Sequence, residues 1–228
     1  MLGFGDFMFG RTAWQAPTAT WLGGTGSYGN SNSLSSLSIG GLNAGSEDRI
    51  VIVGVVSEAT SDVPTVTVGG FSGVAVGVST TFYCLITYYA FYNIAATTVN
   101  VAATFTQTTN HSIGVWKVIF AGGSSAVYTG RQASFNNTNG PISATITTYT
   151  NGVILGMATK PQSSTTPSTW SGTNAPVTDA TVSNGRGSNR YGHLNATTGA
   201  SSTISVTGSD SNKALSENLL AISPIPFY

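Results

Sequence analysis

Short runs of β-branched residues, with apolar side chains at every second position, recur through most of this chain. Clear examples are residues 49–57, 65–68 and 73–79, and glycine or proline interrupts the chain near their ends. A period of two is that of a β-strand, in which successive side chains point to opposite faces. No segment carries a convincing helical pattern of three turns. The alternation therefore predicts an all-β protein.

Further strands are predicted over residues 81–93, 98–106, 112–120, 142–150, 153–159, 177–183, 190–197, 202–207 and 215–222. Residues 49–57 and 112–120 carry apolar groups on both faces, which is typical of strands at the centre of a sheet. Asn151-Gly152 separates two of the runs and is the strongest short signal for a hairpin with a type I′ turn. We expect an antiparallel β-sandwich, jelly-roll-like, with an extended N-terminal arm.

Similarities between the two halves of the chain bear on its domain organisation. Residues 98–119 resemble residues 203–222, and residues 49–57 pair loosely with residues 152–160. Two duplicated half-sandwiches and one sandwich with similar halves would both produce this pattern. We favour a single β-sandwich domain over residues 47–228, because the short linking loops offer no hinge. Residues 1–16 are interpreted as an apolar anchoring segment, and residues 17–46 as a Gly/Ser-rich arm or loop.

Charge is scarce in this chain. Charged residues make up 7% of the 228 residues, eight basic and eight acidic, while hydrophobic residues make up 40%. This balance favours a folded chain over a disordered one. It provides no cationic surface for phosphates, so nucleic acid is not an expected partner. Because copies of a neutral protein do not repel one another, we hypothesise that copies or partners cover many of its polar faces.

Neither membrane insertion nor secretion is expected from the sequence. No apolar run approaches the ~20 residues that span a bilayer. Residues 1–11 lack a basic n-region, and glycines and Asp6 interrupt their apolar stretch, so they make a poor signal peptide. The single cysteine, Cys84, lies in an apolar run and is predicted to be a small buried side chain.

Residues capable of catalysis do not form a recognisable set, so we expect a protein that is not an enzyme. His111 and His193 have no metal-ligand neighbour at i+2 or i+4, and neither a metal site nor a cofactor is predicted. Most acids lie beside turn residues, where Asp is a common turn former. A polysaccharide-degrading enzyme would need two carboxyls about 5 to 9.5 Å apart. Glu58 and Asp179 are the acids through which to test that option.

Aromatic residues are the more suggestive feature of the chain. A segment near its start is too apolar for a free tail and too short to bury itself. We interpret it either as an anchor on a partner protein or as a strand folded back on its own domain. The residues of this candidate anchor are Phe4, Phe7, Met8, Phe9 and Trp14.

Trp170 and Tyr191 fall in or near predicted loops and are the candidates for binding a glycan, on which exposed aromatic rings can stack. The alternative for Trp170 is a loop plug packed under its own strand. The aromatic cluster over residues 82–92 is expected in the core.

The chain resembles small virion proteins of tailed bacteriophages over most of its length. The resemblance is carried by the apolar Gly-Phe leader at residues 1–10, by a Thr/Ser/Gly-rich sandwich of low charge with strands such as residues 49–56, and by the closing residues 221–224. It implies a protein displayed in many copies on a capsid or tail and joined through its N-terminal segment. Such proteins serve as capsid decoration proteins, head fibres or spikes, and short tail fibres.

The resemblance also implies the partners and the location of the chain. The expected partners are other virion proteins, further copies in a homo-oligomer and a host-surface glycan. The expected location is the virion, assembled in the host cytoplasm. The alternative from another class is a secreted carbohydrate-binding β-sandwich module, whose Trp and Tyr loops would form the binding surface.

Overall fold

The computed structural model describes residues 16–27, 33–42, 48–80, 84–92, 94–120, 126–135, 141–161, 163, 165–184, 187–208 and 214–224. Every regular element in these ranges is a β-strand, and every strand pairing is antiparallel, so the predicted all-β class is confirmed. These ranges contain no helix long and apolar enough to cross a membrane. The jelly-roll-like connectivity and the extended N-terminal arm remain predictions.

In the first half of the chain the strands are β1 (Thr18–Ser27), β2 (Ser33–Ile39), β3 (Asp48–Ser57), β4 (Thr65–Val68), β5 (Phe71–Ser72), β6 (Val74–Thr80), β7 (Leu85–Tyr92), β8 (Val99–Thr104) and β9 (His111–Phe120). In the second half they are β10 (Ala126–Phe135), β11 (Pro141–Thr147), β12 (Gly152–Lys160), β13 (Val177–Ser183), β14 (Ser188–Thr197), β15 (Ser201–Thr207) and β16 (Leu215–Pro224).

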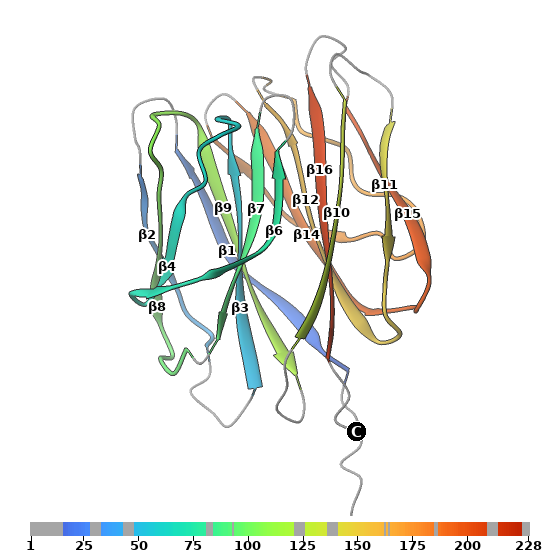
Figure 1. Ribbon diagram of the computed structural model, residues 1–228, viewed down its shortest axis with the longest axis horizontal. Coiled ribbons are helices and arrows are strands. Elements are labelled where there is room, and N and C mark those ends of the chain that lie inside the picture. Colours follow the sequence, from blue (N-terminus) through green and yellow to red (C-terminus); the bar gives the residue numbers. More distant parts are fainter. Residues whose placement is uncertain are drawn as a thin grey trace, which may run out of the picture.

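The strands form four stacked layers (Figure 1). Two five-stranded sheets lie in the middle, with the strand orders β1-β9-β3-β7-β6 and β10-β16-β12-β14-β13. An outer sheet, β2-β8-β4-β5, covers the first middle sheet, and a smaller one, β11-β15, covers the second. Three clusters of buried apolar side chains fill the spaces between the layers. The described strands therefore build a sandwich of sheets.

The central strands of the middle sheets are apolar on both faces because they lie between two other layers. In β3, Ile50 and Ile52 point into the space between the middle sheets, whereas Val51 and Val53 point toward the outer sheet. Burial of each such side chain stabilises the fold by about 1.5–3 kcal/mol. Strand β9 lies between β1 and β3 and is buried on both faces as well. The sequence-based prediction that both strands are central is confirmed.

The two halves of the chain follow one topology. The strand order of the first middle sheet becomes that of the second when each strand is exchanged for its counterpart. The counterparts of β1, β9, β3, β7 and β6 are β10, β16, β12, β14 and β13, respectively. The outer pairs β2-β8 and β11-β15 correspond in the same way. The segments that resemble each other in sequence, residues 98–119 and 203–222 and residues 49–57 and 152–160, fall on corresponding strands.

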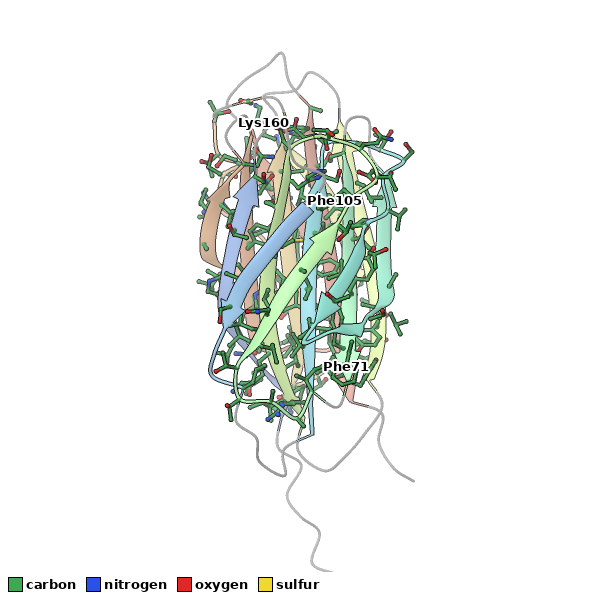
Figure 2. The ribbon with its side chains drawn as sticks, turned by 90° about the vertical axis from the view of Figure 1, so that its left-hand side faces the viewer. Phe71, Phe105 and Lys160 are labelled. Carbon is green, nitrogen blue, oxygen red and sulfur yellow. The ribbon has the colours of Figure 1, made fainter. Side chains whose placement is uncertain are left out.

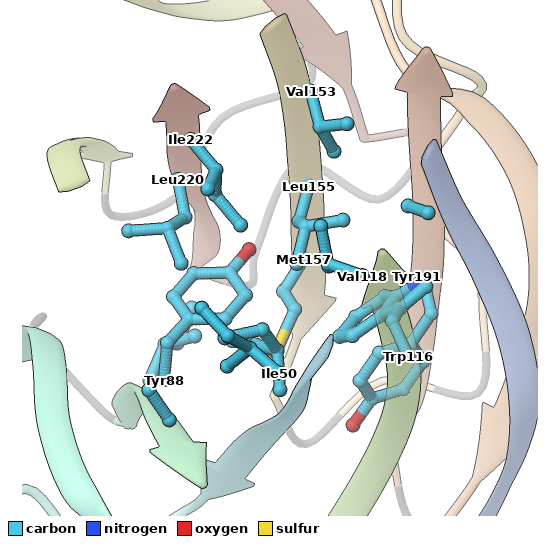
Figure 3. Close-up of a cluster of buried hydrophobic side chains, with 14 of the residues drawn as sticks. Ile50, Tyr88, Trp116, Val118, Val153, Leu155, Met157, Tyr191, Leu220 and Ile222 are labelled. Carbon is cyan, nitrogen blue, oxygen red and sulfur yellow. The ribbon is translucent and has the colours of Figure 1, made fainter. Parts of the chain in front are cut away.

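The two middle sheets pack face to face around one shared core. Strand β1 lies against β13 and β14, while β6 lies against β10, so the halves are arranged like the subunits of a two-fold dimer. Side chains of both halves meet between the sheets, including Tyr88 and Trp116 from the first half and Met157 and Tyr191 from the second (Figure 3). That residues 47–228 fold as one unit remains a prediction.

Two tyrosines join the halves at corresponding places. Tyr88 is the fourth residue of β7, and Tyr191 is the fourth residue of β14. The Tyr88 hydroxyl donates to the backbone oxygen of Asn218 at 3.0 Å, and the Tyr191 hydroxyl is hydrogen-bonded to Oγ of Ser112 at 2.6 Å. Both rings are fully buried, and burial raises the pKa of both hydroxyls. They therefore stay protonated and tie one half to the other.

Residues 17–46 do not form the predicted arm or loop where the structure describes them. Strands β1 and β2 occupy much of this range, and Ala19 and Trp21 of β1 pack into the shared core. Strand β10 was likewise not predicted. All three are edge strands whose Gly- and Ser-rich segments show little apolar alternation. Pairing with a neighbouring strand, rather than local propensity, makes them strands.

The hairpin predicted at Asn151-Gly152 is wrong. The turn itself forms, because Asn151 adopts a φ of 57° and the Gly152 amide donates to the oxygen of Tyr149 at 2.9 Å. The strands on either side lie in different sheets, however, since β11 pairs with β15 and β12 pairs with β14 and β16. The turn carries the chain from the outer sheet to the middle sheet. A turn sequence determines local backbone geometry but not which strands pair.

The aromatic cluster over residues 82–92 was predicted to lie in the core, and most of its described aromatic residues do. Tyr88, Tyr89 and Phe91 are buried in the core, whereas Tyr92 at the end of β7 is 42% exposed. Cys84 is fully buried, as predicted for a small apolar side chain.

The contact between Gly54 and Met157 gives a test of the shared core. A Cβ atom at Gly54 would overlap Sδ of Met157 and lie 3.0 Å from a ring carbon of Trp116. Gly54→Ala should therefore overpack the core and lower the free energy of unfolding by about 1–3 kcal/mol in chemical denaturation. Gly77→Ala, in β6 of the same sheet, is the matched control, because its Cβ would meet neighbours no closer than 3.6 Å. Equal losses in the two variants would contradict the close contact.

Candidate functional site

The candidate anchor residues of the N-terminal segment are not among those that the structure describes. Phe4, Phe7, Met8, Phe9 and Trp14 all lie outside the described ranges. Their role on a partner protein therefore remains a prediction from the sequence.

The two candidate glycan-binding residues are buried. Trp170 is 6% exposed and packs beneath the outer sheet β11-β15, where its indole covers Gly156. Tyr191 is 0% exposed and lies in the shared core. A sugar can stack only on an aromatic face that solvent reaches. Burial therefore argues against a glycan-binding role for either residue, and the position of Trp170 is that of a buried loop plug, here beneath β11-β15.

Two carboxylates accept hydrogen bonds that fix loops at one end of the strands. Asp62 accepts from the backbone amides of Thr106 at 2.7 Å and Gln107 at 3.0 Å. Burial raises the pKa of Asp62, but hydrogen bonds from Thr106 and Gln107 outweigh burial and lower the pKa overall. Glu58 accepts from the side-chain amide of Asn110 at 2.6 Å. Both acids thus hold the segments between β3 and β4 and between β8 and β9.

A hydrogen-bonded histidine and aspartate lie at the edge of the shared core. Nδ1 of His193 is 2.7 Å from Oδ1 of Asp179, and the Trp116 indole donates to Oδ2 at 2.8 Å. Such a pair would serve as base and orienting group in a hydrolase if a nucleophile stood beside the imidazole. The residues paired with His193 on the two adjacent strands are Leu155 and Val177, which are not nucleophiles. We interpret the pair as a further link between the halves.

The other histidine also has a structural environment. His111 is fully buried and stacks on Phe105, with ring centroids 3.5 Å apart. Within the described ranges, no three His, Cys, Asp or Glu side chains lie close enough together to hold a metal ion.

Glu217 of β16 is an ionisable group buried in an apolar layer. It is 0% exposed, and neither carboxyl oxygen has a well-formed hydrogen bond to a described residue. Burial raises its pKa to about 8, although the Trp170 indole and the Ala144 backbone amide act in the opposite direction. Raised pKa values are common in active sites, but a substrate cannot reach a carboxyl that is fully enclosed. Nothing in the sequence around Glu217 marks it as unusual.

Phe71 lies beside an open pocket, at the opposite end of the strands from Phe105 and Lys160 (Figure 2). The pocket has a volume of about 590 Å³ and is lined by residues 69–71, 94–96 and 98–100, none of which is charged. Gly69 and Gly70 form the turn between β4 and β5 with φ values of 59° and 84°, a conformation that glycine adopts without strain. The Gly69 amide donates to the oxygen of Asn100 at 2.9 Å, which fixes this turn to β8.

No pattern in the sequence predicted this pocket. The signal that could have located part of it is Gly69-Gly70, a pair typical of a tight turn that presents the next residue, Phe71. The other wall, residues 94–100, comes close only through the pairing of β4 with β8. The pocket is a candidate binding site of the described structure.

Comparison with known proteins leaves the family of the chain open. No protein-family model matches the sequence, and no curated protein matches it significantly. The function must therefore be argued from the sequence and the structure themselves.

Glu217 makes the stability of the protein dependent on pH. Its pKa of about 8 in the folded state lies above the ordinary value of 4.5, so the folded chain holds a proton that the unfolded chain releases. Stability should therefore fall as pH rises through this window, with a slope approaching about 1.4 kcal/mol per pH unit, and level off above it. Glu217→Gln should remove this slope and raise the free energy of unfolding at about pH 8 more than at about pH 5.

Chemical denaturation of both proteins at the two pH values measures this difference. Glu58→Gln is the matched control, because Glu58 already accepts a hydrogen bond from Asn110 and should gain no stability at the higher pH. A gain for Glu217→Gln that is the same at both pH values would show that the buried charge is not its cause.

Proposed function

We propose that this chain is a non-catalytic structural protein of a bacteriophage virion, displayed in multiple copies on the capsid or tail. The supporting observation is the use that the described structure makes of its polar groups. Asp62 and Glu58 fix loops, Asp179 and His193 link the halves with Trp116, and Glu217 is enclosed. These groups serve the architecture, and such a rigid sandwich suits a decoration, spike or fibre role.

The surface of the described part favours a protein that works through contacts with other molecules. Large apolar side chains are exposed there while charged residues are only 7% of the chain. Such a surface offers little electrostatic repulsion between copies and apolar groups for a partner to cover. The exposed apolar residues are Val63, Phe71, Val74, Tyr92 and Val177.

The N-terminal segment is the proposed attachment point to other virion proteins. Its composition, in which Phe4, Phe7 and Phe9 are interspersed with glycines, supports this role, and the segment lies outside the described ranges. The proposal includes assembly into a homo-oligomer and contact with a host-surface glycan. A secreted carbohydrate-binding module is the less favoured function, because Trp170 and Tyr191, which would have formed its binding surface, are buried.

Proteomics of purified phage particles tests the proposed location. The chain should be present in many copies per particle, alongside capsid and tail proteins, in the particles of the phage that encodes it. The matched control is a non-virion protein encoded by the same phage, which should be depleted from the particles. Detection of the chain only in the soluble fraction would contradict the proposal.

Deleting residues 2–12 tests the proposed attachment. The shortened chain should keep its folded β structure, as judged by circular dichroism, and lose assembly, as judged by sedimentation velocity. Val177→Ala is the control, because it removes exposed apolar surface elsewhere and should leave assembly intact. Unfolding of the shortened chain would show that the segment belongs to its own domain. A full-length chain that stays a monomer at micromolar concentration would contradict the oligomer.

A further inference from the structure

The pocket beside Phe71 lies where the two corresponding halves differ. In the first half, the connection from β7 to β8 includes residues 94–98, and the β4-β5 hairpin lies beside this described part of it. In the second half, residues 198–200 alone connect β14 to β15. A single bridge between Ser171 and Ser205 replaces the pairing of β4 with β8. The longer connection and the hairpin are therefore not needed to complete the sandwich.

In the second half, hydrogen bonds of Asn174 hold the corresponding region. Its side-chain amide donates to the oxygen of Thr198 at 3.1 Å and to Oγ of Ser202 at 2.9 Å, and its Oδ1 accepts from the Thr198 amide at 3.0 Å. The first half has the open pocket in the corresponding place. The second half forms the same fold without such a pocket. The pocket is therefore not required for folding and is available for binding a ligand.

The lining of the pocket defines the chemistry of its ligand. Phe71 is 65% exposed, so its ring offers an apolar face for stacking. Apart from its chain neighbours Gly69 and Phe71, no residue has an atom within 4 Å of a Cβ placed on Gly70, so the turn next to Phe71 is open on this side. The exposed Thr98 and Asn100 provide hydroxyl and amide groups, and no charged side chain lines the site.

An uncharged ligand with an apolar face and hydroxyl groups at its edge matches this lining. A pyranose ring has these properties, since its C–H groups can lie against an aromatic face while its hydroxyls bond to side-chain or backbone polar groups. The volume of about 590 Å³ falls within the range of small-ligand sites, about 300–1,000 Å³.

We propose that this pocket binds a neutral pyranose, with Phe71 as the stacking surface and Thr98 and Asn100 as hydrogen-bonding groups. The inference rests on the proposed function only for the source of the sugar, a glycan of the host surface. The proposed sugar site thus lies in the first half of the chain, whereas Trp170 and Tyr191, the candidates from the sequence, lie in the second half.

Nuclear magnetic resonance titration of the full-length, ¹⁵N-labelled protein tests the site. The probes are the methyl glycosides of glucose, galactose, mannose and N-acetylglucosamine, with glucuronic acid as the charged counterpart. At least one neutral sugar should shift the amide resonances of residues 69–71 and 94–100. Phe71→Ala should weaken its binding about fivefold to tenfold through loss of the stacking face. Because Phe71 is exposed, this variant should keep the remaining resonances in place.

Val177→Ala is the matched control, because Val177 is 66% exposed and lies on β13, outside the pocket. It should bind the sugar as the parent chain does. The proposal is overturned if no neutral sugar in the panel shifts the pocket resonances, if glucuronic acid binds more tightly, or if both variants lose binding equally. Sugar binding by a chain absent from virions would reject the proposed function alone, whereas a virion protein without sugar binding would reject this site alone.

Discussion

The close packing of the two middle sheets is the contact on which the rest of the structure depends. Gly54 leaves the space that Met157 fills, and Tyr88 and Tyr191 reach across from one half to the other. Each middle sheet is also covered by an outer sheet, so its central strands have no face for solvent. Separation of the halves would expose apolar surface along the whole shared core, which is why the halves stabilise each other.

This arrangement explains why the chain needs so few charges. Strands buried on both faces offer few positions where a charged side chain could reach water, and most links between the halves are neutral. Asn195 exchanges hydrogen bonds with the backbone of Ala19, and Asn189 donates to Ser112. Neutral hydrogen bonds satisfy buried polar groups without the large desolvation cost of ions. Glu217 shows that cost, because burial raises its pKa.

Comparison of the two corresponding halves shows which strands and loops the fold requires and which it can lack. Both halves need the strand order of the middle sheet, and both cover it with an outer pair. Only the first half combines the β4-β5 hairpin with a long connection and the exposed ring of Phe71. In the second half, Asn174 closes the corresponding region with hydrogen bonds. Differences of this kind are where a duplicated architecture can acquire a binding function.

The sequence by itself determined the fold class, most strand positions and the central places of β3 and β9, because local apolar alternation reports which faces of a strand are buried. It missed β1, β2 and β10, whose extended conformation comes from pairing at sheet edges, and it mispaired the strands around Asn151-Gly152. The sequence also did not predict the pocket, since residues 69–71 and 94–100 meet only through the pairing of β4 with β8. Only the tertiary structure decided which strands pair and which aromatic rings face solvent, because both depend on contacts between residues distant in the chain.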